Sequence, residues 1–162
     1  LPALSTASSR TLTSGVLVLV CLQAASGGMI GAQYALTACP ALGECPAFAF
    51  GDLLAGGALD PFRALSIGGG RVVPPGGAAG LHIIHRALGI AVAVATLVLA
   101  YRMRRVDRRV ALLLAALAAG APLLGVAAIA GMPSLPMTAL HNAATASLVA
   151  ALAYLATRKV MG

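Results

Sequence analysis

The chain has 162 residues, of which 60% are hydrophobic and only 9% are charged, so a water-soluble domain with the usual share of charged side chains is excluded. Lys and Arg number 11 against 4 acidic residues, which gives a net charge of +7. The basic residues lie between apolar runs and do not cover a polar domain, so we expect no nucleic-acid partner. The composition indicates a membrane protein surrounded by lipid.

Four apolar stretches are long enough to cross a bilayer, at about residues 12–36, 80–101, 110–131 and 138–157. Inside a bilayer each backbone polar group must be bonded within the protein, which predicts that all four are helices. A cleaved signal peptide is the alternative interpretation of the first stretch, although apolar sequence continues beyond the candidate cleavage point. Gly27 and Gly31 on this stretch are interpreted as a packing pair, with a face thinned for a flat cofactor as the alternative.

The basic residues fall mostly on one side of these spans. They precede the first, separate the second from the third, and follow the fourth: Arg10, Arg102, Arg104, Arg105, Arg108, Arg109, Arg158 and Lys159. The positive-inside rule makes this side cytoplasmic. We therefore expect an integral protein of the bacterial or archaeal inner (plasma) membrane, with both termini in the cytoplasm and residues 37–79 forming a long external loop.

The external loop contains Cys39 and Cys45, with five residues between them. An oxidising exterior favours a disulfide between them, with free thiols or a redox-active pair as alternatives. Residues 51–80 are rich in Gly and Pro, and a long connection of this kind is usually either a functional lid or poorly ordered. Four apolar residues are candidates for laying the loop over the mouth of the bundle: Phe48, Phe50, Leu53 and Leu54.

A repeat relates the second and fourth stretches. A shift of 56 positions places His85 on His141 and Arg102 on Arg158, so each stretch reads His, sixteen mostly apolar residues, then Arg. This register favours two pseudo-symmetric helical hairpins. At 1.5 Å per residue the histidines lie roughly 25 Å from the cytoplasmic end, near the outer boundary of the hydrocarbon layer. We expect an all-α membrane protein, a four-transmembrane-helix bundle forming a single domain over residues 1–162.

The matched histidines are the main functional signal. An ionisable residue at membrane depth is costly unless it finds a partner inside the bundle. Two histidines at one depth on different helices are typical of bis-His haem ligation, so we predict His85 and His141 as iron ligands. The simpler alternative for either is an interfacial histidine bonded to a carbonyl or to water. A zinc or dinuclear centre is disfavoured, because it needs three or four ligands and the spans contain no Asp or Glu.

Two further residues accompany this pair. His82 lies three residues before His85 on nearly the same helical face, so it is an alternative ligand or a contact for the edge of a bound macrocycle. Arg86 is a candidate partner for a haem propionate, with an arginine that reaches lipid headgroups as the alternative.

Taken together, these residues resemble the heme A synthase family. The matches are Gln23, Gly27-Gly28, Cys39 with Cys45, His85-Arg86, and His141 in Ala-Leu-His-Asn-Ala. The resemblance covers nearly the whole chain. Full-length members are similar to two such four-helix halves in tandem, of which one binds a haem b through two histidines and the other oxidises a ring methyl group of haem O. The resemblance implies that this chain corresponds to one half.

The chain departs from the family at one position. The catalytic half has Glu-x-x-His-Arg where this chain reads His82-Ile83-Ile84-His85-Arg86, so it looks more like the half that holds haem b. The resemblance implies one haem b, with a role in haem A formation or in related haem-based electron transfer. Whether the chain is an enzyme stays open, since pairing as a homodimer would keep haem O oxidation possible. The alternatives are an accessory or electron-transfer subunit of a larger respiratory or photosynthetic complex, and a structural bundle with a vestigial site.

Overall fold

The computed structural model describes residues 6–39, 45, 47, 50–130 and 135–157. Four of its helices are long and apolar enough to cross a membrane. They are α1 (Thr6–Ala32), α3 (Ala78–Met103), α4 (Arg108–Ile129) and α5 (Leu135–Thr157). The predicted all-α fold with four membrane spans is confirmed, and the chain is an integral membrane protein.

Three helix boundaries differ from the hydropathy pattern by three residues or more, and the first helix begins at Thr6, six residues before the predicted start. The first helix ends at Ala32, not near residue 36, because Tyr34 adopts the left-handed conformation with a φ of 51°. A short 3₁₀ helix, η1 (Ala35–Ala38), follows it. The last helix begins at Leu135, three residues before the predicted start, because a proline is tolerated in the first turn of a helix.

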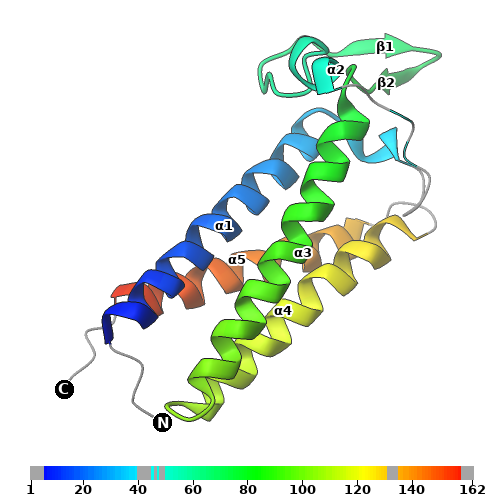
Figure 1. Cartoon of the computed structure of the whole chain (residues 1–162). Coiled ribbons are helices and arrows are strands. Elements are labelled where there is room, and N and C mark those ends of the chain that lie inside the picture. Colours follow the sequence, from blue (N-terminus) through cyan, green and yellow to red (C-terminus); the bar gives the residue numbers. More distant parts are fainter. Residues whose placement is uncertain (1–5, 40–44, 46, 48–49, 131–134, 158–162) are drawn as a thin grey trace.

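The four long helices form a ring in which each packs on two neighbours. Helix α1 lies against α3 and α5, and α4 lies against the same two helices. The two helices that carry the matched histidines, α3 and α5, are therefore diagonal to each other (Figure 1). The start of α1, the α3–α4 turn and the end of α5 lie at one end of the molecule (Figure 1).

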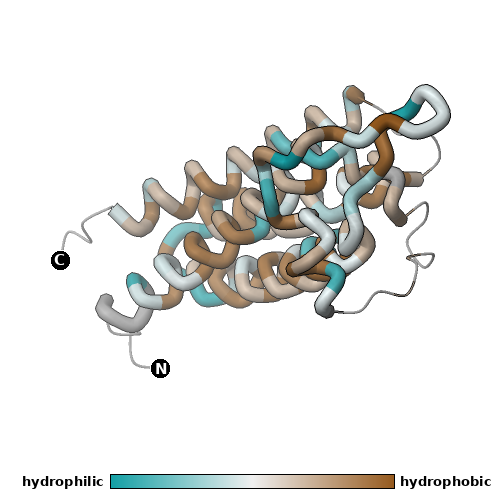
Figure 2. Tube along the Cα trace, turned by 90° about the horizontal axis from the view of Figure 1, so that it is seen from above, coloured by the Kyte–Doolittle hydropathy of each residue, from teal (hydrophilic) through white to brown (hydrophobic). Residues whose placement is uncertain are grey.

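Apolar side chains fill the bundle and also cover its outside. The central cluster consists of buried residues from all four long helices: Val16, Val20, Val92, Leu99, Ala100, Leu114, Leu148 and Leu152. Large apolar side chains such as Ile90 and Leu123 are exposed on the outer faces. Hydrophobic residues occur along all four helices in Figure 2, as expected for a bundle that faces lipid.

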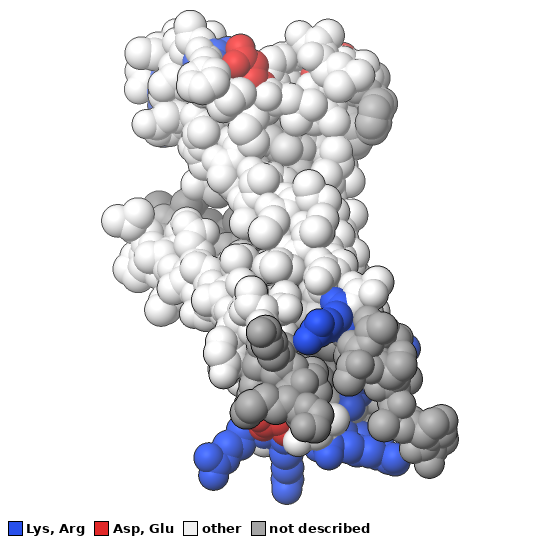
Figure 3. All heavy atoms as spheres, turned by 90° about the vertical axis from the view of Figure 1, so that its left-hand side faces the viewer, with Lys and Arg blue, Asp and Glu red and all other residues white. Residues whose placement is uncertain are grey.

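Basic residues gather at the end that holds the α3–α4 turn (Figure 3). Asp107 starts α4 there by accepting hydrogen bonds from the backbone nitrogens of Arg109 and Val110, at 3.0 and 3.1 Å. Arg104 stacks over the Tyr101 ring at 3.8 Å. The turn is thus a well-capped connection that keeps its arginines on one side of the bundle.

At the opposite end, the segment between α1 and α3 forms a small outer lobe. It contains α2 (Phe50–Ala55) and an antiparallel hairpin of β1 (Ser66–Gly68) and β2 (Arg71–Val73). Gly69 and Gly70 join these strands with φ values of 58° and 75°, the backbone of a two-residue hairpin turn. The loop predicted over residues 37–79 is therefore partly regular.

The lobe is attached through fewer apolar side chains than the sequence indicated. Leu53 is buried in a cluster with Ile30 and Leu81, whereas Leu54 is 66% exposed, so the expectation for Leu54 was wrong. In a six-residue helix the two neighbouring leucines point to different sides, and only one can face α1 and α3. Phe48 and the side chain of Phe50 lie outside the described part of the chain.

Candidate functional site

The imidazole rings of His85 and His141 meet inside the bundle. Their centroids are 6.4 Å apart and their planes are inclined by 74°. Two imidazoles that share one metal ion, with each metal–nitrogen bond about 2 Å long, have centroids separated by roughly 6 Å. The helices thus bring together the two residues that the 56-residue register matched, at a separation suited to a common metal ion.

Both ring nitrogens of His85 have partners on α1. Ser26 Oγ lies 2.9 Å from Nδ1, and Gln23 Nε2 lies 3.2 Å from Nε2. The Ser26 hydroxyl donates its single proton to the Gln23 backbone carbonyl at 2.8 Å, so it can only accept from His85. Nδ1 of His85 therefore carries the proton, and Nε2 has a free lone pair that accepts from the Gln23 amide.

His141 reaches the same tautomer through the backbone. Its Nδ1 lies 2.8 Å from the carbonyl oxygen of Ala121 on α4. A carbonyl only accepts, so Nδ1 is again the protonated nitrogen, and in the neutral imidazole Nε2 keeps its lone pair. Histidines that bind metals almost always donate their second ring nitrogen in this way, which fixes the tautomer and the ring orientation.

Each imidazole also lies against a glycine on the other helix of its own hairpin. A Cβ added at Gly27 on α1 would lie 2.9 Å from His85 Cε1, and one added at Gly125 on α4 would lie 3.1 Å from His141 Cε1. A Cβ at Gly31 would have no atom within 4 Å. The interpretation of Gly27 and Gly31 as a packing pair is therefore wrong for Gly31, whereas Gly27 packs closely against the His85 ring of α3.

A second register, which the sequence analysis missed, relates α1 to α4. A shift of 98 positions places Gly27 on Gly125, and it also matches buried positions along both helices. The further pairs are Val16 with Leu114, Val20 with Ala118, and Gln23 with Ala121. The buried pairs differ in type, so the signals for this register are the recurring Gly and the matches of Arg10 with Arg108 and Leu19 with Leu117.

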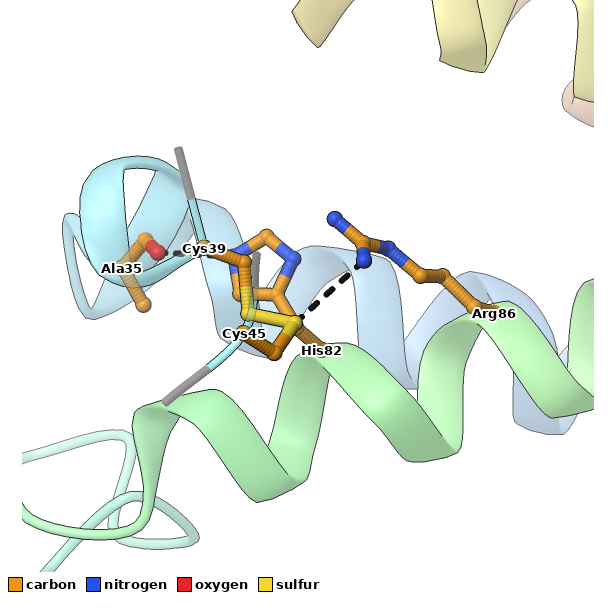
Figure 4. Close-up of a disulfide and its surroundings, with 5 residues drawn as sticks. All are labelled: Ala35, Cys39, Cys45, His82 and Arg86. Carbon is orange, nitrogen blue, oxygen red and sulfur yellow. Dashed lines mark hydrogen bonds between the residues drawn. A yellow bond between two sulfur atoms is a disulfide. The ribbon is translucent and has the colours of Figure 1, made fainter. Parts of the chain in front are cut away.

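His82 turns toward the outer lobe. It is only 5% exposed, and its Nε2 donates to the carbonyl oxygen of Ala35 in η1 at 2.7 Å (Figure 4). Because a carbonyl cannot donate, Nε2 is the protonated nitrogen, the opposite of the tautomer of His85 and His141. His82 thus fastens η1 to α3.

Arg86 also reaches the lobe. Cys39 and Cys45 form a disulfide with Cα atoms 4.5 Å apart, and Arg86 Nη1 donates to Cys45 Sγ at 3.3 Å (Figure 4). His82 and Arg86 therefore attach the lobe to successive turns of α3, and His85 lies between them in the sequence. This sulfur contact is a role that the sequence analysis did not foresee.

A small cavity of about 40 Å³ lies beside the His141 ring. It is lined by all four long helices and includes His141, Gln23, Gly89 and Thr145. Gln23 Oε1 is buried there without a hydrogen-bond partner. Pockets for small molecules are usually about 300–1,000 Å³ in volume, so side chains must move before a large planar ligand enters.

The side chains that could bind a metal ion at this site are the imidazoles of His85 and His141. Among the described residues, no group of three or more His, Cys, Asp or Glu side chains comes together as a metal site. Two neighbouring histidines on different helices would suit an iron ion that a porphyrin also holds, since that ion needs only two ligands from the protein. A structural zinc site would need a third and a fourth protein ligand.

The comparison with protein families matches this arrangement of residues to a known group. The family model COX15-CtaA, described as cytochrome oxidase assembly protein, matches residues 3–153. The chain belongs to the heme A synthase family. The match includes all of α3 and α4 and the ring pair, and it supports a role in cytochrome oxidase assembly and haem A synthesis. No curated protein and no solved structure gave a significant match.

Proposed function

We propose that this member of the heme A synthase family binds one haem b through His85 and His141, and serves in haem A formation or in haem-based electron transfer derived from it. The observation that carries the proposal is the pair of imidazoles with centroids 6.4 Å apart. Both rings have an unprotonated Nε2, which is the form that binds iron.

The chain's own residues have distinct tasks in this proposal. Ser26 and the Ala121 carbonyl orient the two rings, while Gly27 and Gly125 give them space. A bound haem supplies one-electron redox chemistry, and the apolar bundle around it keeps bulk water away. The side chains that line the cavity must move apart to admit the macrocycle, because the cavity is small.

We place the haem near the outer face of the membrane, with both termini in the cytoplasm. His85 and His141 lie near the starts of α3 and α5, whereas the arginines gather at the opposite end of the bundle, where α3 ends and α4 begins (Figure 3). The positive-inside rule assigns the arginine-rich end to the cytoplasm. A bacterial or archaeal inner membrane accords with this orientation.

A second candidate is an electron-transfer or accessory subunit of a larger respiratory or photosynthetic complex. The position of the family's catalytic Glu is occupied by His82, whose Nε2 is bonded to the Ala35 carbonyl. This histidine secures the lobe and does not supply a carboxylate beside the ring pair. The haem-holding role is therefore favoured over independent catalysis, with a homodimer or a host complex as the partner.

The decisive experiment is haem reconstitution of the purified chain in detergent or nanodiscs. We expect a b-type pyridine haemochrome spectrum and a six-coordinate low-spin signal in the wild type. His85→Ala and His141→Ala should each lose the low-spin signal, whereas the control His82→Ala should keep it. Low-spin character that survives in both ligand variants, or no haem uptake by the wild type, would contradict the proposal.

Catalysis is tested separately by expressing the chain with a source of haem O. Formation of haem A, detected by chromatography of the extracted pigments, would assign the enzymatic role. Unchanged haem O together with co-purification of a respiratory or photosynthetic complex would favour the second candidate.

A further inference from the structure

The Gln23 side chain occupies the nitrogen of His85 that a metal ion would need. Its Nε2 lies 3.2 Å from His85 Nε2, while its Oε1 is buried without a hydrogen-bond partner. An amide with one end bonded and the other unsatisfied in an apolar interior is held at a free-energy cost. This contact is therefore easier to replace than a fully bonded one.

The surroundings leave the amide room. A Cβ added at Gly89 on α3 would lie 3.2 Å from Gln23 Nε2, so the amide passes close to the glycine and any side chain there would press on it. Gln23 and Gly89 both line the cavity of about 40 Å³ beside His141. A space of this size is adjacent to the amide and is able to take up a polar group or a water molecule.

Ser26 determines which nitrogen of His85 is capped. Its hydroxyl proton is used by the Gln23 carbonyl, so the hydroxyl can only accept from Nδ1. The second hairpin has no equivalent of this arrangement, because the position matching Gln23 is Ala121 and its carbonyl orients His141.

We propose that Gln23 is a displaceable cap on His85, and that Ser26 is a positioning residue that keeps the capped nitrogen unprotonated. The proposal rests on the proposed function, since haem iron is the group that replaces the cap. In the haem-free chain Gln23 donates to His85 Nε2, and on haem binding the amide leaves this nitrogen. His141 needs no cap, because the backbone alone sets its tautomer.

The first test uses ¹⁵N nuclear magnetic resonance of the haem-free full chain in nanodiscs, which distinguishes protonated from unprotonated ring nitrogens. We expect Nδ1–H for His85 and His141, and Nε2–H for His82. Ser26→Ala should shift His85 toward Nε2–H, since Nδ1 loses its acceptor and the Gln23 amide can turn to accept. Ser26→Thr should restore the wild-type tautomer.

Two controls belong to this test. Ser147→Ala removes a hydroxyl that bonds only the Ala143 carbonyl of its own helix, so it should change none of the three rings. His141 serves as an internal reference in every variant, because its partner is a backbone carbonyl. If His85 stays in the Nδ1–H form in Ser26→Ala, the positioning role of Ser26 is wrong.

The second test measures haem affinity by titration. Without the cap, Gln23→Leu should bind haem about three- to tenfold more tightly than the wild type, the usual worth of one hydrogen bond. Gln23→Ala should change affinity in the same direction, and it provides a second variant if Gln23→Leu does not fold. Asn142→Leu, which removes an exposed amide on α5, should leave affinity unchanged.

Failure of the Gln23 cap and failure of the proposed haem site give different results in these two tests. Equal or weaker haem binding by both Gln23 variants, with the wild type binding haem normally, overturns the cap and leaves the haem site standing. A wild type that takes up no haem overturns the proposed function, and the resonance experiment still decides the role of Ser26.

Discussion

The two hairpins hold their histidines in the same tautomer, with the proton on Nδ1, but they do so by different means. In the first hairpin, α1 supplies side chains, since Ser26 and Gln23 bond the two nitrogens of His85. In the second, α4 supplies only the backbone carbonyl of Ala121 to His141. Point substitutions can therefore change the support of His85 directly, whereas the support of His141 changes only if the backbone of α4 moves. We expect both arrangements to prepare the histidines for haem binding.

The glycines that face the rings are common to both hairpins, and replacing them should have the largest effect. Gly27→Leu and Gly125→Leu place a side chain where each imidazole lies, so we expect loss of haem binding and a destabilisation of about 1–3 kcal/mol. Haem content and thermal unfolding in detergent measure the two effects.

The same helices provide matched controls for these substitutions. A Cβ at Gly28 or Gly120 would meet no atom within 4 Å, so Gly28→Leu and Gly120→Leu should leave haem content unchanged. Equal losses in the control and test variants would show that the effect comes from the helix backbone and not from the rings.

Loss of the disulfide should destabilise the first hairpin and not the second, because only the first carries the outer lobe. Closing a loop of this length is worth about 2 kcal/mol, which Cys39→Ser with Cys45→Ser should remove from the lobe. Hydrogen exchange should then speed up in η1 and stay unchanged in α5. Cys21→Ser, which changes an exposed free cysteine, is the control. Faster exchange in α5 would contradict the separation of the two hairpins.

His82→Ala should loosen the lobe to a smaller extent. The substitution leaves the buried carbonyl of Ala35 without its donor, at a cost of about 1–2 kcal/mol. Limited proteolysis of residues 50–77 measures this effect, and the low-spin haem signal should persist. Loss of that signal would mean that His82, and not only His85, belongs to the ligand set. Ile83→Ala, at a partly exposed neighbour, serves for comparison.

The smallest effect is expected in the second hairpin. Thr145 donates to the backbone carbonyl of His141 within α5, so Thr145→Val removes a bond that does not touch the ring. We expect a change below about 1 kcal/mol in stability and an unchanged His141 tautomer. A tautomer change would show that side chains also orient the second imidazole.

Much of the fold could be predicted from the sequence, because spans of this length and hydropathy have few alternatives in a bilayer. The early end of α1 could not, since it depends on the left-handed backbone of Tyr34, a residue with no strong preference for that conformation. The Gly69-Gly70 turn was readable as a hairpin signal, but the apolar residues around it did not alternate clearly.

The site was predictable only in part. Equal spacing to an arginine was enough to pair His85 with His141 as a hypothesis, and their ring contact now supports it. Ser26 was missed because a serine in an apolar helix usually bonds its own backbone, and here it does that and also contacts a ring. The sequence placed His82 and His85 on nearly the same helical face, but residues three apart share a face only approximately. The different direction of the His82 side chain could therefore not be predicted.

The diagonal placement of α3 and α5 has a mechanical consequence. Among the described residues of α5 only Leu148 and Leu152 are fully buried, and partly buried side chains such as Val149 and Leu155 pack beside them against the core. A ligand bonded to both imidazoles would act as a cross-brace between helices that are not neighbours in the ring. Loss of such a ligand would remove this link and leave α3 and α5 connected mainly through α1 and α4.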